Sequence, residues 1–158
     1  MTAPLRVFPD TGVLLAMIVF PKDRRGNLTL AGEALTLYNA GAYRLVIGQA
    51  IADELDEVLD ERFPAHRAAA VSLLRPFAGQ FIRRPTPREI ADVLDSCTDP
   101  ADAPVFASAL IARPDIVLAN DFAAFHTPVA KLLWARYGIT VESLYGLLCV
   151  FGRRLRKV

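Results

Sequence analysis

Four carboxylic acids stand at positions in this sequence where they could share a site. Asp10 directly follows the apolar run "RVFP" and Asp121 follows "IVLAN", whereas Glu54 and Asp102 lie in the helix-forming segments "QAIADELDEVLDER" and "DPADAPVFASAL". Clustered carboxylates repel one another unless a cation joins them, and ligand sets made only of oxygen select a hard ion such as Mg²⁺ or Mn²⁺. Carboxylate-held ions of this kind activate a water and stabilise the leaving oxygen when a phosphodiester is hydrolysed.

Short apolar runs alternate with helix-forming segments along the chain. We predict strands at 5–8, 43–48, 80–85, 115–121 and 139–143, and helices at 13–20, 29–40, 49–63, 64–79, 87–95, 100–113, 127–138 and from about 143 onward. This order predicts an α/β fold, a three-layer α/β/α sandwich around a central, mostly parallel sheet of about four to five strands. Ligands of such sheets bind at the carboxyl ends of the strands, which is where Asp10 and Asp121 are expected.

Helical spacing selects the other two acids. Asp102 lies three, four and seven residues before apolar residues of its segment, which places it at the N-terminal end of the stripe that faces the core. Glu54 lies between Ile51 and Val58 at the edge of its own stripe, whereas Asp53, Glu57 and Asp60 point away. An ordinary role remains open for each aspartate, because Asp is a common helix N-cap and complements the helix dipole.

Asp10-Thr11-Gly12 is also the form in which an aspartic protease presents its catalytic acid. Such proteases are all-β and need two copies of the triplet or an obligate dimer. This chain has one copy, and a helical run follows it. The sequence therefore argues against a protease, and because its two histidines, His66 and His126, are isolated, it also argues against a zinc site.

Composition indicates one globular domain over residues 1–158, in which a C-terminal helix and a basic tail occupy about 143–158. Apolar residues make up 53% of the chain and charged residues 22%. The longest apolar run, residues 13–20, is too short to span a bilayer, and no signal-peptide pattern precedes it. The two cysteines are too few for a disulfide scaffold. We expect a cytoplasmic protein without a membrane partner.

The four acidic segments, taken in order, resemble the motifs of the PIN-domain nucleases, in particular the VapC-like toxin components of toxin–antitoxin systems. The resemblance runs from about residue 5 to residue 141 and is carried by "VFPDTG", "AIADELDEVLDERF", "DPADAPVFASAL" and "VLANDF". It implies that Asp10, Glu54, Asp102 and Asp121 bind Mg²⁺ or Mn²⁺ and activate water for RNA hydrolysis. It also implies a homodimer and a small antitoxin partner that covers the acidic pocket.

Three positions depart from the family pattern. Gly12 stands where relatives usually have Asn, and Asn120 replaces a usual Ser or Thr but can still donate a hydrogen bond. Pro9 takes the place of an apolar strand residue, so we expect strand pairing to end early. These changes leave open a catalytically weakened PIN fold that acts as an RNA-binding or protein-interaction module. A third class, an α/β phosphohydrolase, needs a second acid where this chain has Gly12.

RNA binding requires cations near the acids, because phosphates dominate nucleic-acid affinity. The candidates are Arg24, Arg25, Arg83, Arg84, Arg88 and the terminal "RRLRK". Alternatively, such clusters of cations only form a solvated surface that keeps the protein soluble. Phe122, directly after Asp121, is a candidate for stacking on a base.

Overall fold

Four parallel strands form the sheet of this protein, for which a computed structural model describes residues 3–156, with the backbone alone for 152–156. The strands lie in the order β2-β1-β3-β4. Their bounds are Arg6–Pro9 for β1, Arg44–Leu45 for β2, Ile116–Leu118 for β3 and Thr140–Glu142 for β4. All three strand pairs are parallel, which confirms the predicted α/β sheet.

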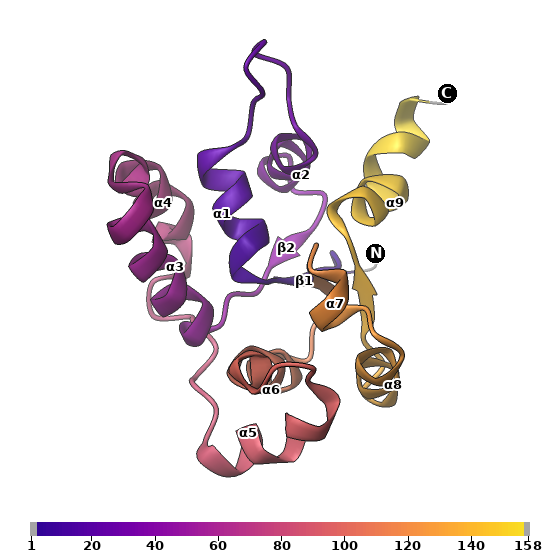
Figure 1. The fold of residues 1–158 in the computed structure, drawn as a ribbon. Coiled ribbons are helices and arrows are strands. Elements are labelled where there is room, and N and C mark those ends of the chain that lie inside the picture. The colour runs from indigo at the N-terminus through magenta and orange to yellow at the C-terminus, as the bar shows by residue number, and fades with distance from the viewer. Residues whose placement is uncertain (1–2, 157–158) are drawn as a thin grey trace.

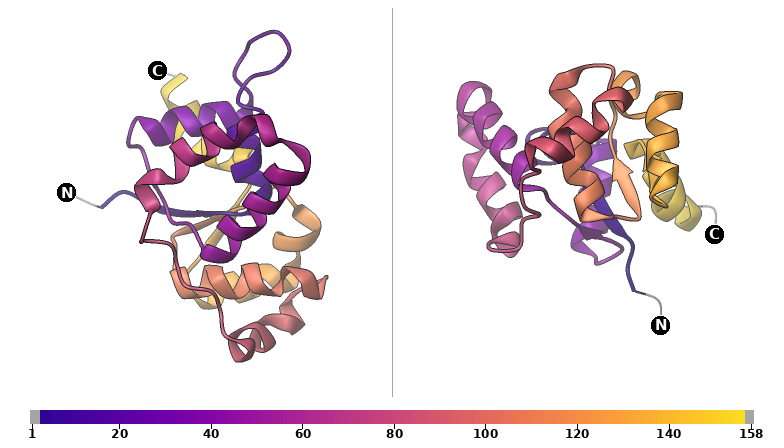
Figure 2. Two further views of the ribbon diagram at one scale, coloured as in Figure 1. Left: turned by 90° about the vertical axis from the view of Figure 1, so that its left-hand side faces the viewer. Right: turned by 90° about the horizontal axis from the view of Figure 1, so that it is seen from below.

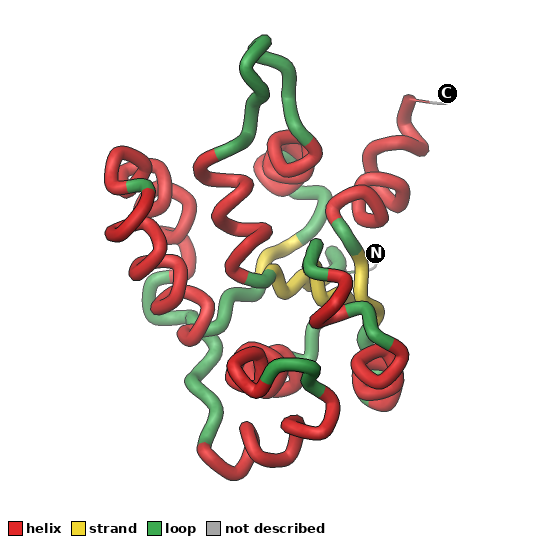
Figure 3. The backbone as a smooth tube through the Cα atoms, viewed as in Figure 1, coloured by secondary structure: helices red, strands yellow, loops and turns green. Residues whose placement is uncertain are grey.

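Helices cover both faces of this sheet (Figure 1). They are α1 (Thr11–Val19), α2 (Leu30–Asn39), α3 (Gln49–Arg62), α4 (Arg67–Leu74), α5 (Pro87–Val93), α6 (Ala103–Ala112), α7 (Phe122–Phe125), α8 (Pro128–Arg136) and α9 (Leu144–Arg156). In Figure 1, α1, α2 and α9 lie above the strands and α5, α6 and α8 below, and Figure 2 shows the same separation. The three-layer sandwich is thus confirmed, with short strands at its centre among long helices (Figure 3). None of the helices in residues 3–156 has the length and apolar content needed to cross a membrane.

The two central strands are buried on both faces. Val7 and Phe8 of β1 and Val117 and Leu118 of β3 are all fully buried, so apolar residues are consecutive in these strands rather than alternating with polar ones. Phe106 of α6 is equally buried. Burial of this kind fixes the strand ends in place, and with them the residues that follow directly.

Pro9 corrects one expectation. We predicted that it ends strand pairing early, yet Pro9 pairs with Leu118, and the Asp10 amide donates to the Leu118 carbonyl at 3.0 Å. The ladder between β1 and β2, in contrast, ends at Val7, which pairs with Leu45. The missing N–H of proline is tolerated because β2 no longer pairs at that level.

Two predicted segments differ from the structure. The strand expected at 80–85 is reduced to a single parallel bridge between Gly48 and Ile82. The helix expected at 64–79 is shortened to α4, with a 3₁₀ turn on either side, Pro64–His66 and Arg75–Phe77. Proline explains the second difference, because it has no N–H to donate within a helix.

The loop between α1 and α2 projects from the molecule as a narrow hairpin, at the top of Figure 1. A bridge between Lys22 and Leu28 closes it, and the Asp23 carboxylate accepts hydrogen bonds from the amides of Arg25 and Asn27 at 2.8 and 3.0 Å. Gly26 turns the chain with a φ of 82°. These contacts give the hairpin a defined structure, and it exposes three cations, Lys22, Arg24 and Arg25.

Candidate active site

Asp10, Glu54, Asp102 and Asp121 line one cavity of about 340 Å³. Asp10 follows β1 directly, and Asp121 lies three residues after the end of β3, so both stand at the carboxyl edge of the sheet. Glu54 comes from α3, and Asp102 ends the 3₁₀ turn that precedes α6. The other residues of the lining are Thr11, Gly12, Val13, Val105, Asn120 and Phe125.

The Asp10 carboxylate both caps a helix and lines the acidic cavity. Its Oδ1 accepts the amide of Val13 at 2.8 Å and caps α1, as the ordinary interpretation predicted. Burial also raises the pKa of Asp10 to about 6, with the charges of Glu54, Asp121 and Asp102 adding to the rise and the Val13 hydrogen bond opposing it. A cap alone does not explain a carboxylate placed where three other acids disfavour its charge.

Glu54 is held by a residue that the sequence analysis did not select. The Thr11 hydroxyl, in a side chain only 8% exposed, donates to Glu54 Oε2 at 2.9 Å. The two residues are distant in sequence, so no local pattern links them. The bond directs the Glu54 carboxylate toward α1, where Asp10 lies.

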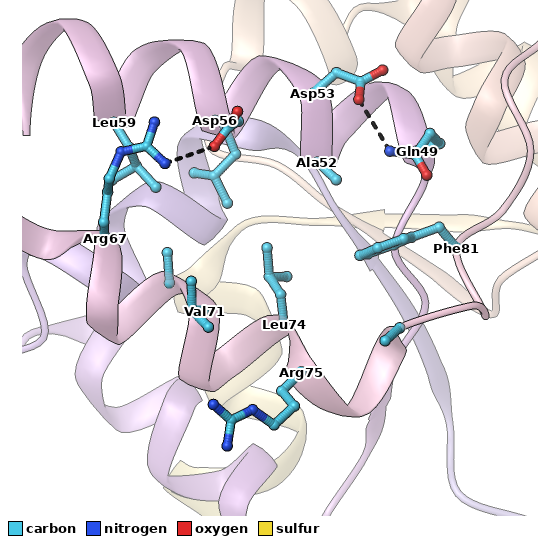
Figure 4. A pocket seen from close by; sticks show the side chains of 13 residues that line it. Gln49, Ala52, Asp53, Asp56, Leu59, Arg67, Val71, Leu74, Arg75 and Phe81 are labelled. Carbon is cyan, nitrogen blue, oxygen red and sulfur yellow. Dashed lines mark hydrogen bonds and ion pairs between the residues drawn. The ribbon is translucent and has the colours of Figure 1, made fainter. Parts of the chain in front are cut away.

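Other acids of α3 face a different cavity. Figure 4 shows Asp53 and Asp56 at the groove between α3 and α4, with hydrogen bonds to Gln49 and Arg67. Arg84 also pairs with Asp53, at 2.8 Å. Of the six acids in α3, all within the described residues, Glu54 is the one that lines the acidic cavity.

Asp102 and Asp121 complete the cavity. Burial raises the pKa of Asp102, and the charges of Asp99, Asp121 and Glu54 add to the rise. Asp99 accepts the Ala101 amide at 2.9 Å and so caps the 3₁₀ turn that ends at Asp102. Asp121 accepts the Ala124 amide at 3.2 Å and so caps α7, a short helix that the sequence analysis did not predict.

The two remaining departures from the family pattern have structural explanations. A Cβ placed on Gly12 would lie 3.7 Å from Asp10 Oδ1, an ordinary contact distance, so the site has room for a side chain there. Asn120 does not use its side chain as a donor to the acids; its Oδ1 accepts the Leu144 amide at 2.9 Å and fixes the start of α9.

The chemistry of this donor set suits a hard divalent cation, because the charged groups are carboxylates, and the charges of Glu54 and Asp121 add to the rise in the pKa of both Asp10 and Asp102. Within residues 3–156, however, no three His, Cys, Asp or Glu side chains are already grouped as a metal site. An ion bound here would therefore have to draw the carboxylates closer together.

The predicted RNA-binding residues have different surroundings. Arg24 and Arg25 are exposed on the hairpin, whereas Arg83 and Arg84 form ion pairs with Glu89 and Asp53. Arg88 lies in the first turn of α5. The side chains of the tail "RRLRK" lie outside the described residues.

Comparison with known proteins gives a family match. A sequence profile described as "PIN domain" matches residues 6–123, a span that includes all four acids of the cavity. No curated protein matches the chain, and neither does any solved structure.

Proposed function

Because this chain belongs to the PIN-domain family, whose members are generally nucleases, we propose that it is a Mg²⁺- or Mn²⁺-dependent endoribonuclease. The observation that carries the proposal is the convergence of Asp10, Glu54, Asp102 and Asp121 on one cavity from four separate segments. Burial, together with repulsion from neighbouring acids, raises the pKa of Asp10 and Asp102, and a bound cation would offset both effects. Electrostatic interactions therefore favour the binding of a cation at this site.

We assign a different role to each residue of the cavity. When bound, the ion supplies a more acidic water and stabilises charge on the leaving oxygen. Asp10 uses Oδ1 to cap α1 and lines the cavity, so Oδ2 is the oxygen that is not engaged in the cap. Thr11 orients Glu54, and Asp102 and Asp121 contribute carboxylates from the starts of α6 and α7. RNA phosphates would be attracted by the exposed cations of the hairpin.

We further propose that the protein is the toxin of a toxin–antitoxin pair, acts as a homodimer and is inhibited by a small antitoxin that covers the cavity. This rests on the sequence resemblance. A second candidate, a PIN fold that binds RNA without cutting it, is favoured by Gly12, which places no side chain beside Asp10 where relatives usually have an amide.

Incubating the purified protein with mixed RNA tests the proposal. We expect fragments with Mn²⁺, none with EDTA, and none from Asp10→Asn, since Asn keeps the shape and the cap but loses the charge. Asp95→Asn is the matched control, because Asp95 is an exposed aspartate that does not line the cavity. Binding without fragments would support the second candidate instead, and cleavage that is equal in the parent and in Asp10→Asn would refute the assigned site.

A further inference from the structure

Two phenylalanines of the short helix α7 have opposite surroundings. Phe125 is 4% exposed and packs in the core, with its ring centroid 5.0 Å from that of Phe106 and 6.4 Å from that of Trp134. Phe122, directly after Asp121, is 60% exposed. Folding therefore explains Phe125 and leaves the exposed ring of Phe122 without a role in the core.

Phe122 is nevertheless held in place. Its ring stacks on the ring of His126, with centroids 4.2 Å apart and planes inclined by 26°. His126 Nε2 lies 2.7 Å from the Ala119 carbonyl, and because a carbonyl can only accept, this contact assigns a proton to Nε2. Ala119 follows β3 directly, so the stacked pair is fixed to the same strand end that presents Asp121.

This pair lies beside the acidic cavity. Asp121 lines the cavity and is the chain neighbour of Phe122, and neighbouring Cα atoms are about 3.8 Å apart. A phosphate in the part of the cavity beside Asp121 would thus bring one of its flanking nucleotides to the Phe122 ring. With one ring face against His126, the opposite face and the edges account for the exposure of Phe122.

From this geometry we propose that Phe122 and His126 form a stacking platform for one base of single-stranded RNA, the base next to the phosphate that enters the acidic cavity. The proposal rests on the proposed function and adds how the substrate is held. Carboxylates repel an RNA backbone, so the cavity needs an attraction that does not depend on charge. Stacking on an aromatic ring supplies one for any base, since every base has a π-face. A ring that is already positioned loses little freedom on binding.

Binding to a short single-stranded RNA separates this platform from the nuclease chemistry. The Asp10→Asn background with Mg²⁺ keeps the RNA intact. There we expect Phe122→Ala to weaken binding about ten-fold, a typical loss for removal of one stacked base. Phe122→Trp should restore affinity, and His126→Ala should give a smaller loss. Tyr137→Ala is the matched control, since Tyr137 is 47% exposed and, unlike Phe122, has no chain neighbour that lines the acidic cavity.

An abasic residue moved along the RNA identifies the stacked base. At one position of the RNA, the abasic residue should weaken binding to the protein that contains Phe122 about ten-fold. The same abasic RNA should cause no further loss of affinity in the Phe122→Ala variant. Three results would each overturn the proposal: equal RNA binding by Phe122→Ala and by its Asp10→Asn parent, additive losses of affinity at every abasic position, or no measurable RNA binding by that parent. In the first case, we would assign the exposed ring to a contact with another protein. If the binding data show this stacking but the protein with Asp10 intact yields no fragments in Mn²⁺, the nuclease function is refuted and the platform still stands.

Discussion

The hydroxyl of Thr11 donates a 2.9 Å hydrogen bond to Oε2 of Glu54, and this contact joins the first turn of α1 to the second turn of α3. Asp10, the residue before Thr11, caps the same helix. One short segment therefore supplies one acid of the cavity and orients another. The relative position of these two acids depends on how α1 packs against α3.

Removing the Thr11 hydroxyl should impair catalysis without unfolding the protein. Thr11→Val keeps the size of the side chain but loses the bond, so Glu54 should become less well oriented and kcat should fall about ten-fold, in line with a lost hydrogen bond to a charged group. Thr11→Ser should retain most of the activity because it keeps the hydroxyl. Steady-state kinetics on one RNA, with circular dichroism as the folding check, measures this. An unchanged kcat in Thr11→Val would show that Glu54 is positioned without the bond.

Neighbouring glutamates of α3 should respond differently to loss of charge. Glu54→Gln should abolish Mn²⁺-dependent cleavage, as Asp10→Asn does, because it removes a carboxylate that lines the cavity. Glu57→Gln should be silent, since Glu57 is exposed on the same helix but does not line the cavity. Cleavage assays on the two variants, run in parallel, provide the comparison. Equal effects would contradict the assignment of Glu54.

Stability without metal should depend on the charge of Asp10. Its pKa is raised from 3.8 to about 6, so the folded state binds this proton more tightly than the unfolded state does. The resulting stability is present below pH 3.8 and is lost as the pH rises through about 6, by at most about 3 kcal/mol. In EDTA at pH 7, Asp10→Asn should therefore melt at a higher temperature than the parent, and the difference should shrink toward pH 4.

Adding Mn²⁺ should reverse the order of the two melting temperatures, so that the parent melts above Asp10→Asn. The parent gains about 1.4 kcal/mol when Mn²⁺ is present at ten times its dissociation constant, and the variant should gain much less. Thermal melting of both proteins, with and without Mn²⁺, measures the effect. If Asp10→Asn is the less stable protein in EDTA and Mn²⁺ moves neither curve, Asp10 is only a helix cap.

Restoring an amide beside Asp10 should strengthen the site. Gly12→Asn fits the available space and adds a polar group near the Asp10 carboxylate, so we expect a lower Mn²⁺ concentration for half-maximal cleavage. Gly12→Ala separates this effect from helix propensity, because replacing Gly within a helix stabilises it by up to about 1 kcal/mol. Metal titrations of the two variants decide the matter: an identical Mn²⁺ requirement would mean that the amide contributes nothing.

The hairpin between α1 and α2 should contribute to RNA affinity through charge. Replacing Arg24 and Arg25 together by Gln should weaken binding and flatten its dependence on salt, since fewer counterions are then released. The same change at Arg75 and Arg136, exposed residues that line other cavities, is the control. Affinity measured over a range of salt concentrations gives the slope. The corresponding expectation for the tail "RRLRK" stays a prediction.

Local sequence was enough to predict the sheet and the placement of the acids. Asp10 and Asp121 follow apolar runs, and parallel strands present their carboxyl ends at one edge, so no distant contact had to be known. Helical periodicity, in the same way, separated Glu54 from Asp53, whose partners Gln49 and Arg84 lie outside the cavity.

Contacts between distant segments could not be predicted in this way. Thr11 and Glu54 belong to different helices, and the Asn120 side chain reaches the amide of Leu144 rather than an acid. The strand expected at 80–85 was wrong for a related reason. Its apolar residues suit a strand, but whether a segment joins a sheet depends on a partner along its length, and Ile82 bridges only to Gly48.

Pairing between β1 and β3 also sets the order in which the molecule can be completed during its synthesis. Val7 pairs with Ile116, so the first strand to leave the ribosome waits for most of the chain before it gains its central neighbour. Contacts so far apart in sequence form late in folding. Asp10 and Asp121 are brought to one edge by that same pairing, which means that a partly made chain has no complete acidic cavity. For a protein proposed to cut RNA, the four acids are therefore brought together only after most of the chain has been made.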